Sequence, residues 1–442
     1  MVFNMVLDRG GTRLKGEVLS AKVTGQNFEE GELCSYSPPG WEWNHDSGFD
    51  SNRPVRGIAL DDDTYMQVCN NHSARYAVMI RKSTGERSTP VLISSGEIQA
   101  DLEEASIVKV SATDVVIFIQ GTSSAQGALQ IFRYTVNLAQ MTMSLVKKNT
   151  VDTAYSSVAC LNKVVYYVAE TNEILMPTHD SSSGLYINIF DANQLTLKTR
   201  TQIASRGENS SWDAYQILSP DGVHFLYVGM WGQSDSNVSR LHWSTFKRSG
   251  TTYSRVENLV EDPTDTKKSD IAYIIGSLIR ATNITVFWIK SQTTSKSYAL
   301  YATTFTLSGD TFSRGVTRSV APQTSEFWGC LEAFPTQIVR VWIWNLKVTQ
   351  WWQVSLDLDT MTWSSAEEIA TSTSTQEWSG SSYDWQQKLR TCLPDKRLVF
   401  NGLAWGSLPD IGKIRPYDKT NIGITQQGGD IGETVTFVKM DT

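Results

Sequence analysis

The sequence predicts an all-β fold, a single β-propeller of about seven four-stranded blades. Two observations predict it: a five-residue run of β-branched and aromatic residues recurs seven times, and similar turns and strands flank most of the runs. Helix signals are almost absent. One four-stranded sheet cannot cover both of its apolar faces, whereas a ring of such sheets covers both and leaves only short outer edges exposed.

The recurring runs extend over most of the chain at an average spacing of about 54 residues. In order, they are YAVMI from Tyr76, VVIFI from Val115, VVYYV from Val164, HFLYV from His224, TVFWI from Thr285, VRVWI from Val339 and LVFNG from Leu398. Short turns rich in Pro, Asn, Asp or Gly precede most of them. Each run is therefore expected to be the second strand of a hairpin.

Further strands are expected around each run. A third strand alternates apolar and polar residues, as in YALYATTF from Tyr298, which indicates one buried face. A fourth strand is more polar, as in TFSRGVTRSV from Thr311. With the short apolar strand before each turn, these give four antiparallel strands per unit.

The domain boundaries follow from where the repeat begins and stops. We expect an N-terminal arm or irregular segment, with a candidate closing strand, over residues 1–54. The seven-bladed propeller is expected over residues 55–430, and a C-terminal strand or tail over residues 431–442. The strands expected to close the ring are Leu14–Val23 and Gly432–Met440.

One stretch carries a family resemblance. LSPDGVHFLYV, Leu218–Val228, resembles the SPDG-plus-strand signature of TolB-like and WD40-like propeller repeats, with Ser219–Gly222 as the SPDG turn. LPDKRLVF, Leu393–Phe400, is a weaker match. The resemblance implies the propeller fold, and it implies no particular function.

Charge and hydropathy exclude several classes of protein. The formal net charge is −7, from 39 Lys and Arg against 46 Asp and Glu, and the two signs are interspersed. This argues against a nucleic-acid footprint, which needs a basic patch. No segment reaches the roughly 18 apolar residues of a membrane helix, so we expect no membrane insertion. No signal peptide is recognised, so we expect folding in a cytoplasm.

Motifs for catalysis or metal binding are missing from the sequence. The five Cys are widely spaced, with no CxxC pattern, and are expected to be reduced. The five His show no HxH or HExxH spacing, and no GxSxG, P-loop or GxGxxG occurs. We therefore expect no catalytic residue, no metal and no cofactor.

The acidic cluster Asp61–Asp63 has two readings. Paired carboxylates could serve glycoside hydrolysis or bind a cation through hard oxygen ligands. The favoured interpretation is a solvated hairpin turn, because the cluster lacks the spacing of a calcium loop.

Tryptophans form the candidate binding group. Exposed aromatic side chains can stack on sugar rings or anchor a protein interface. The alternative is that these large side chains fill gaps between blades. The candidates, which fall in or beside expected loops, are Trp41, Trp43, Trp212, Trp231, Trp378 and Trp385.

Three functional hypotheses remain. The first is a non-enzymatic structural or binding propeller in a larger assembly, such as a virion or tail protein of a bacterial virus with an assembly or host-recognition role. Its partners would be other protein subunits. The second is a lectin-like propeller that binds surface glycans through loop aromatics. The third is a glycoside hydrolase or lyase on a propeller scaffold.

Overall fold

The structure is a computed structural model. It describes the whole chain apart from residues 1, 7–12, 24, 31, 38–41, 46–56, 72–73, 82, 85, 96–104, 121–127, 153–157, 160–164, 181–183, 206–214, 234–237, 258–259, 262–271, 292–297, 321–326, 332–336, 346–349, 372–390, 394–396, 401–403, 408–411, 417–421, 426–429, 432 and 441–442. The described residues form strands and turns, which confirms the all-β prediction. Among them, no helix has the length and apolar character needed to cross a membrane.

The chain divides into two compact units. The larger comprises His45–Pro394 and Leu398–Trp405, and the smaller comprises Met1–Asn44, Asp395–Arg397 and Gly406–Thr442. These bounds differ from the expected 1–54, 55–430 and 431–442. The reason is that β35 (Gly412–Pro416) and β36 (Ile422–Thr425) pair with the N-terminal strand β3 (Leu33–Ser37) and with no blade.

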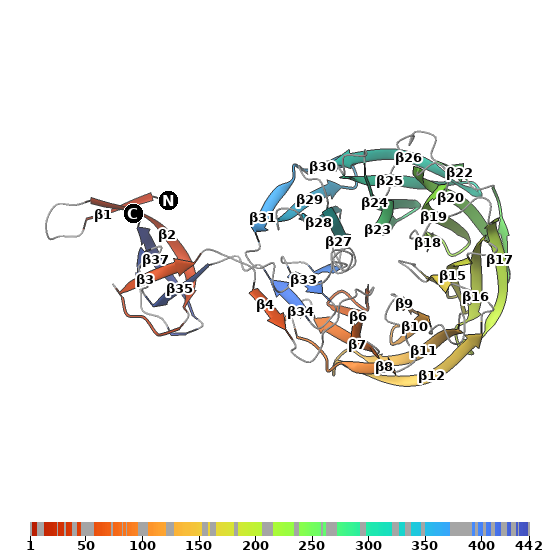
Figure 1. The fold of residues 1–442 in the computed structure, drawn as a ribbon, viewed down its shortest axis with the longest axis horizontal. Coiled ribbons are helices and arrows are strands. Elements are labelled where there is room, and N and C mark those ends of the chain that lie inside the picture. Colours follow the sequence, from red (N-terminus) through yellow and green to blue (C-terminus); the bar gives the residue numbers. More distant parts are fainter. Residues whose placement is uncertain are drawn as a thin grey trace. The chain divides into compact units, whose positions relative to one another are not determined.

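The larger unit is a β-propeller, as predicted: its sheets stand in a ring, with the first strand of each sheet near the axis and the last on the rim (Figure 1). Six sheets are built from consecutive strands. Blade 1 contains β5 (Gly57–Ala59), β6 (Thr64–Asn71), β7 (Ala74–Arg81) and β8 (Val91–Ser95). Blade 2 contains β9 (Ala105–Lys109), β10 (Asp114–Gln120), β11 (Ala128–Asn137) and β12 (Thr142–Asp152). Blade 3 contains β13 (Val158–Ala159), β14 (Tyr166–Val168), β15 (Glu173–Asp180), β16 (Gly184–Asp191) and β17 (Leu197–Ser205).

The next three blades follow the same order. Blade 4 contains β18 (Tyr215–Leu218), β19 (His224–Gln233), β20 (Val238–Ser249), β21 (Thr252–Arg255) and β22 (Val260–Glu261). Blade 5 contains β23 (Ala272–Arg280), β24 (Asn283–Ser291), β25 (Tyr298–Ser308) and β26 (Thr311–Val320). Blade 6 contains β27 (Phe327–Leu331), β28 (Ile338–Asn345), β29 (Gln350–Asp357), β30 (Thr362–Trp363) and β31 (Glu367–Thr371).

A seventh sheet combines both parts of the chain. Its first three strands are β32 (Thr391–Leu393), β33 (Arg397–Phe400) and β34 (Ala404–Ser407), and its fourth is the N-terminal β4 (Glu42–His45). The expected closing strands, 14–23 and 432–440, do pair with each other, but they do so in the smaller unit. The closing strand is therefore β4, and that expectation is corrected.

Five of the seven apolar runs lie in second strands, as predicted: four lie in β10, β19, β24 and β28, and the described part of the fifth, Leu398–Phe400, lies in β33. YAVMI instead belongs to β7, a third strand, and VVYYV ends in β14, a first strand. The true second strands of blades 1 and 3 are β6 and β15. They escaped recognition because polar residues, Gln67 and Glu173, occupy buried positions in them.

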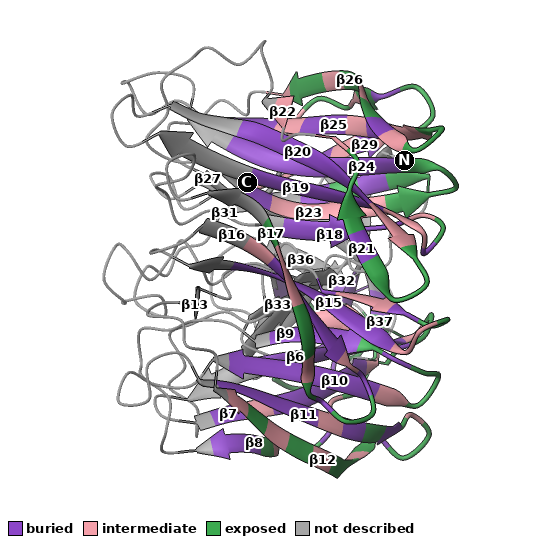
Figure 2. Cartoon of the chain, turned by 90° about the vertical axis from the view of Figure 1, so that its right-hand side faces the viewer, coloured by how far each residue is buried: buried purple, intermediate pink, exposed green. Residues whose placement is uncertain are grey.

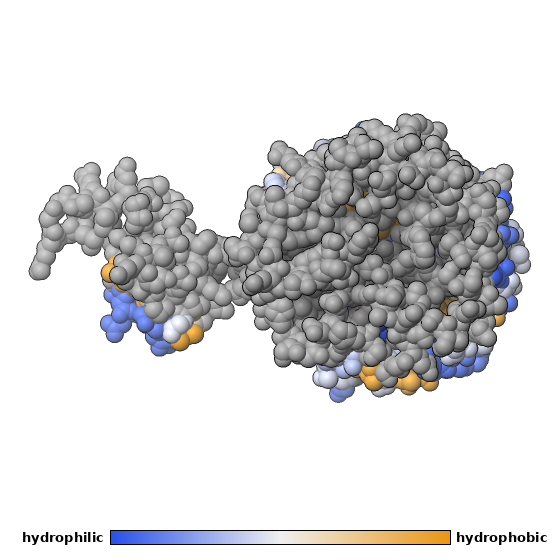
Figure 3. Space-filling model, viewed as in Figure 1, coloured by the Kyte–Doolittle hydropathy of each residue, from blue (hydrophilic) through white to orange (hydrophobic). Residues whose placement is uncertain are grey.

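The apolar cores lie between neighbouring blades. Val115, Ile117 and Ile119 of β10 face the core shared with blade 1, whereas Val116 and Phe118 face the core shared with blade 3. A run without polar residues is therefore a strand buried on both faces. Figure 2 shows these buried strands with exposed turns at one end. Exposed apolar residues remain on parts of the rim, beside β8 and β12 (Figure 3).

Val116, Leu226 and Val286, expected to be buried from their places in the runs, are fully buried, and Val165 is 6% exposed. Val399 lies outside the residues whose side chains are described.

Each described inter-blade core also receives a side chain from the later blade, either from the turn before its outer strand or from the start of that strand. In blades 2, 3 and 6 these plug residues are Met141, Leu195 and Met361, all with positive φ. In blades 4 and 5 a glycine, Gly250 or Gly309, takes the positive φ instead. There the plug is the nearby Tyr253 or Phe312. The turn thus ties each blade to the one before it.

Leu195→Ala should lower the free energy of unfolding of the propeller by about 2–5 kcal/mol, because Leu195 is fully buried and its removal leaves a cavity. Leu145→Ala is the matched control, since Leu145 is 53% exposed on β12, and its effect should stay within about 0.5 kcal/mol. Urea unfolding curves measure both. Equal effects of the two variants would show that the plug contributes nothing.

The smaller unit is built from both ends of the chain. The strand β2 (Arg13–Val23) pairs with β37 (Thr434–Met440) and, in parallel, with β35. Because β3 joins β35 to β36, and β36 pairs with β37, these five strands form a closed ring. β1 (Val2–Val6) adds to the first residues of β2. The described core residues are Ala21, Val23, Phe28, Cys34 and Val435.

Cys34 is buried in this core as a free thiol. Burial raises its pKa to about 11, so the thiol stays protonated and unreactive at neutral pH. The other four Cys lie outside the described side chains.

Candidate functional site

The six candidate tryptophans fall outside the described side chains, so their role in binding stays a prediction. The backbone of two of them is described. Trp43 lies in β4 and so belongs to a blade, although the sequence suggested a loop outside the repeat. Trp231 lies near the end of β19. The backbone of Trp41, Trp212, Trp378 and Trp385 is not described.

Asp61–Asp63 form the turn between β5 and β6, as the favoured interpretation held. The Asp61 Oδ1 atom accepts hydrogen bonds from the backbone N–H groups of Asp63, at 2.9 Å, and Thr64, at 2.5 Å. Asp63 accepts two from Ser83, each at 2.7 Å. Burial is the largest single effect on Asp61 and raises its pKa, but the hydrogen bonds from Asp63 and Thr64 together outweigh it and lower the pKa of Asp61. The carboxylates of Asp61 and Asp63 therefore stabilise the hairpin.

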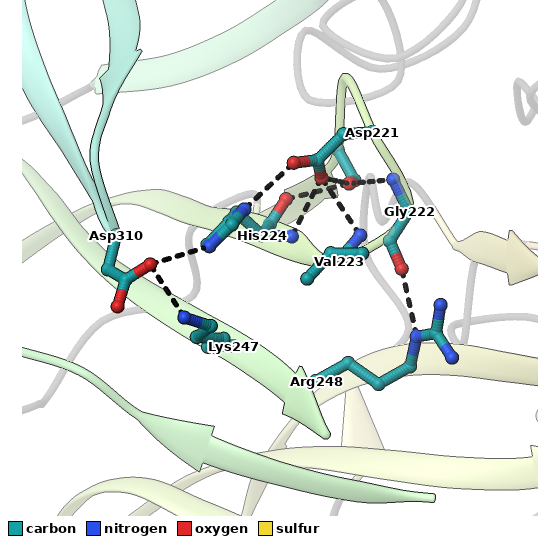
Figure 4. A network of polar contacts seen from close by, with 8 residues as sticks. Asp221, Gly222, Val223, His224, Lys247, Arg248 and Asp310 are labelled. Atoms are coloured by element: carbon teal, nitrogen blue, oxygen red, sulfur yellow. Dashed lines mark hydrogen bonds and ion pairs between the residues drawn. The ribbon is translucent and has the colours of Figure 1, made fainter. Parts of the chain in front are cut away.

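A highly connected polar cluster among the described residues is centred on the SPDG turn between β18 and β19 (Figure 4). The Asp221 Oδ1 atom accepts hydrogen bonds from the backbone N–H groups of Val223 and His224, both at 2.8 Å. Ser219 Oγ accepts one from Gly222 N–H at 2.8 Å and donates one to the His224 carbonyl at 2.7 Å. Gly222 has φ +70°, a conformation that favours glycine. These contacts explain why Ser219, Asp221 and Gly222 occupy their positions in the motif.

His224 links this turn to the next blade. Its Nδ1 atom lies 2.8 Å from Asp221 Oδ2, and its Nε2 atom lies 3.1 Å from Oδ1 of Asp310 in blade 5. Lys247 donates to the same Asp310 oxygen at 2.6 Å. Hydrogen bonds from Lys247 and His224 lower the pKa of Asp310. Both imidazole nitrogens therefore face carboxylates, and they can donate to both only when both carry protons.

A second arm of the cluster reaches the preceding blade. Arg248 donates from Nε to the Gly222 carbonyl at 2.9 Å, and its guanidinium lies 3.6 Å from the Glu170 carboxylate of blade 3. The SPDG turn is thus bonded to both neighbouring blades.

The residues Ser219, Asp221 and His224 do not form a nucleophile–base pair. A catalytic triad needs the hydroxyl to bond a free imidazole nitrogen, whereas Ser219 bonds a backbone carbonyl and both His224 nitrogens face carboxylates. Among the described residues, no group of three or more His, Cys, Asp or Glu side chains could hold a metal ion. The arrangement instead joins blades.

Similar bonds occur at other junctions on this side of the ring. Arg81 donates to the Leu138 carbonyl at 2.7 Å, and Arg133 to Asn193 at 2.5 Å. Arg280 pairs with Asp359. In each case a cationic side chain bonds the turn that carries the next plug residue. The SPDG cluster is therefore the most developed member of a repeated set of inter-blade bonds.

A buried carboxylate lies at the junction of blades 3 and 4. Glu173 is fully buried, pairs with Lys198 and accepts a hydrogen bond from the Tyr253 hydroxyl at 2.7 Å. Burial opposes the charge of Glu173, but hydrogen bonds from Lys198 and Tyr253 outweigh it and lower the pKa of Glu173. Burial and the neighbouring carboxylate raise the pKa of Tyr253, so Tyr253 remains a donor.

Sequence reasoning identified the SPDG turn but missed Asp310 and Glu173. Asp310 lies 86 residues after His224, and nothing in its own sequence marks the contact. The available signal was its position in the turn Ser308–Asp310, which matches the positions of Asn193 and Asp359 in their turns.

Glu173→Gln tests the buried carboxylate through pH. Because the pKa of Glu173 is lowered in the folded state, its stabilisation is present above its ordinary value of 4.5 and is lost as the pH falls through the folded-state value. The variant should lose about 1–3 kcal/mol at pH 7, and its stability should fall less steeply below pH 4.5 than that of the wild type. Glu86→Gln is the control, since Glu86 is 58% exposed. If the stability of Glu173→Gln falls as steeply below pH 4.5 as that of the wild type, Glu173 does not stabilise the fold as an ionised carboxylate.

Asp221→Ala should lower the free energy of unfolding by about 1–2 kcal/mol, because two backbone N–H groups and the His224 ring lose their acceptor. Asp62→Ala removes an exposed aspartate from the corresponding turn of blade 1 and should change stability by less than about 0.5 kcal/mol. Thermal unfolding compares the two. If they are equal, the SPDG cluster is not a junction that stabilises the propeller.

Comparisons with known proteins find only distant structural matches. No protein-family model and no curated protein matches the chain. Among solved structures, the Kuenenia stuttgartiensis hydrazine synthase is similar over 76% of this chain and 83% of its own, at 10% identity and a TM-score of 0.44. An uncharacterized protein from Listeria monocytogenes EGD-e is similar over 88% and 96%, at 11% identity and a TM-score of 0.41. A protein from Lactobacillus plantarum is similar over 72% and 85%, at 11% identity and a TM-score of 0.45.

Proposed function

We propose that the chain is a non-enzymatic binding propeller that works as a component of a larger assembly. In this proposal the smaller unit attaches the chain to the assembly, and the propeller is the rigid part that presents a binding surface. A virion or tail particle of a bacterial virus, with the chain in an assembly or host-recognition role, is the kind of assembly expected from the sequence.

The observation that carries this proposal is that the chain forms two separate compact units. The sheet that β4 completes shares no strand with the five-stranded ring of the smaller unit, although Glu42–Asn44 of β4 are counted with that unit. That unit has its own core, and it holds the chain both before and after the propeller. A second folded unit that contains the chain segments before and after the propeller is suited to attach the propeller to an assembly.

The use of polar residues supports the same proposal. The Asp221–His224–Asp310 and Glu173–Lys198–Tyr253 clusters bond one blade to another. Such bonds stiffen the ring, and a rigid scaffold presents loops to a partner at low entropic cost.

Val435→Asp tests attachment in the full chain. Val435 is 1% exposed in the core of the smaller unit, and a buried charge there should cost about 3–5 kcal/mol and unfold that unit. We expect the wild-type chain to purify from its source at fixed stoichiometry in a large complex, as measured by native mass spectrometry. The variant should be absent from the complex while calorimetry still shows the propeller transition.

Ile431→Asp is the matched control, because Ile431 is 60% exposed in the same unit; this variant should assemble like the wild type. A wild-type chain that stays monomeric, or a Val435→Asp chain that assembles normally, would overturn the proposal.

A further inference from the structure

The strand β1 of the smaller unit is an edge strand that lacks the usual protection against pairing. Its sequence, VFNMV, has no charged residue and no Pro, and its register with β2 is continuous. Natural edge strands are usually interrupted by a charge, a Pro or a β-bulge. Every described outer strand of the propeller with four or more residues has such a feature: β8 has a register shift, and the others have at least one charged residue. β1 is therefore open to pairing with another strand.

Part of the β1–β2 pair is a ribbon of only two strands. β1 pairs with Arg13–Glu17 of β2, whereas β37 begins to pair with β2 at Gly16 and β35 at Ala21. Among the described pairings, Arg13–Lys15 therefore have only β1 beside them (Figure 1). A two-stranded ribbon is marginally stable alone in water, and three or more strands with an apolar face are needed for stability. One further strand would stabilise the ribbon, and the five residues of β1 offer an open edge for it.

The register gives this ribbon one apolar face. Met5 lies opposite Leu14, and Phe3 lies opposite Gly16. Because successive residues of a strand alternate between the two faces, Phe3, Met5 and Leu14 share one face. Asn4, at the centre of β1, belongs to the other face. A strand added beside β1 would extend the apolar face if it had the same pattern of residues.

The sequence of β1 is complementary to itself. In an antiparallel pair of two β1 strands related by a two-fold axis at Asn4, Val2 is opposite Val6 and Phe3 is opposite Met5. These pairs are apolar, and the two Asn4 residues meet at the axis, where each amide has both donors and an acceptor. An axis perpendicular to the sheet leaves the apolar positions of both copies on the same face. The strands β2, β1, β1 and β2 would then form one sheet with a continuous apolar face.

We infer that the smaller unit pairs with a second copy of this chain through β1, antiparallel and in register about Asn4. A two-fold interface requires each residue to suit the residue that symmetry places opposite it, and all five residues of β1 meet this requirement. A strand from a different protein would require no such symmetry in β1. The inference rests on the proposal that the smaller unit attaches the chain, and it specifies the partner as another copy.

Cysteine cross-linking in the full chain tests the register. Asn4→Cys places two thiols opposite each other at the axis, where the Cβ atoms of paired residues lie about 4.5–5.5 Å apart, close to the separation in a disulfide. Mild oxidation should give at least about tenfold more covalent dimer on a non-reducing gel than in the wild type. The wild-type chain, with its own five Cys, shows the background.

Val6→Cys is the matched control, because Val6 shares a face with Asn4 but would lie opposite Val2 of the other copy. Val6→Cys alone should cross-link no more than the wild type, and so should Val2→Cys alone. An equimolar mixture of the Val2→Cys and Val6→Cys chains should form the covalent dimer.

A charge exchange tests the same pairing without thiols. Val2→Lys/Val6→Lys puts Lys opposite Lys at both ends of the strand pair, and should weaken the dimer at least about tenfold in sedimentation equilibrium. Val2→Glu/Val6→Glu should weaken it similarly. A mixture of the two variants should form the mixed dimer, which native mass spectrometry identifies by its mass. Recovery in the mixture distinguishes repulsion at the interface from misfolding of β1.

Three outcomes would overturn the inference. They are equal cross-linking by Asn4→Cys and Val6→Cys, no recovery in the mixture of charged variants, and cross-linking of Asn4→Cys to a different protein of the source complex in place of a second copy.

These results are separable from the test of attachment. If Val435→Asp abolishes assembly while Asn4→Cys stays monomeric on oxidation, the proposed function stands and the pairing of β1 is wrong. If Asn4→Cys cross-links to a second copy but the wild-type chain joins no larger complex, the pairing of β1 stands and the proposed function is wrong.

Discussion

Burial of apolar surface between neighbouring blades is the constraint on which the rest of the structure depends. In blades 2–5 both faces of each sheet are apolar, and the two neighbouring sheets of the ring cover them. A second strand such as β24 must therefore be apolar at consecutive positions, because Val286 and Phe287 face different cores. Blade spacing, turn position and the polar bonds of the junctions all follow from this arrangement.

The turn side of the ring adds a second layer of contacts to these cores. Plug residues such as Leu195 extend the apolar contact to the end of the blade. Beside them, cations such as Arg133 and Lys247 bond the turns of the next blade. Apolar contacts supply most of the stabilisation, while the directional bonds fix how far one blade can slide along its neighbour. The SPDG cluster belongs to this second layer, which is why it joins blades and leaves no imidazole nitrogen free.

The sequence predicted the repeat well because second strands buried on both faces have a distinctive composition. The prediction failed for second strands that contain buried polar residues. Glu173 of β15 is charged and fully buried, because Lys198 and Tyr253 compensate its charge. The closing strand β4, Glu42–His45, could not be recognised because four residues carry no periodic pattern. Within the candidate site, the SPDG turn could be recognised in the sequence because its residues are consecutive. Its partner Asp310 depends on the packing of two blades, which spacing along the chain does not encode.

The order of synthesis gives the closure by β4 a further consequence. β4 leaves the ribosome long before its sheet partner β34, which begins at Ala404, and at usual elongation rates the interval is about 20–70 s. The strands β2 and β3 wait similarly for β35, β36 and β37. During this interval the nascent chain presents unpaired strands at its N-terminal end, next to blades that can already fold. The last forty or so residues therefore complete both units, and a ribosome that stops early leaves neither one closed.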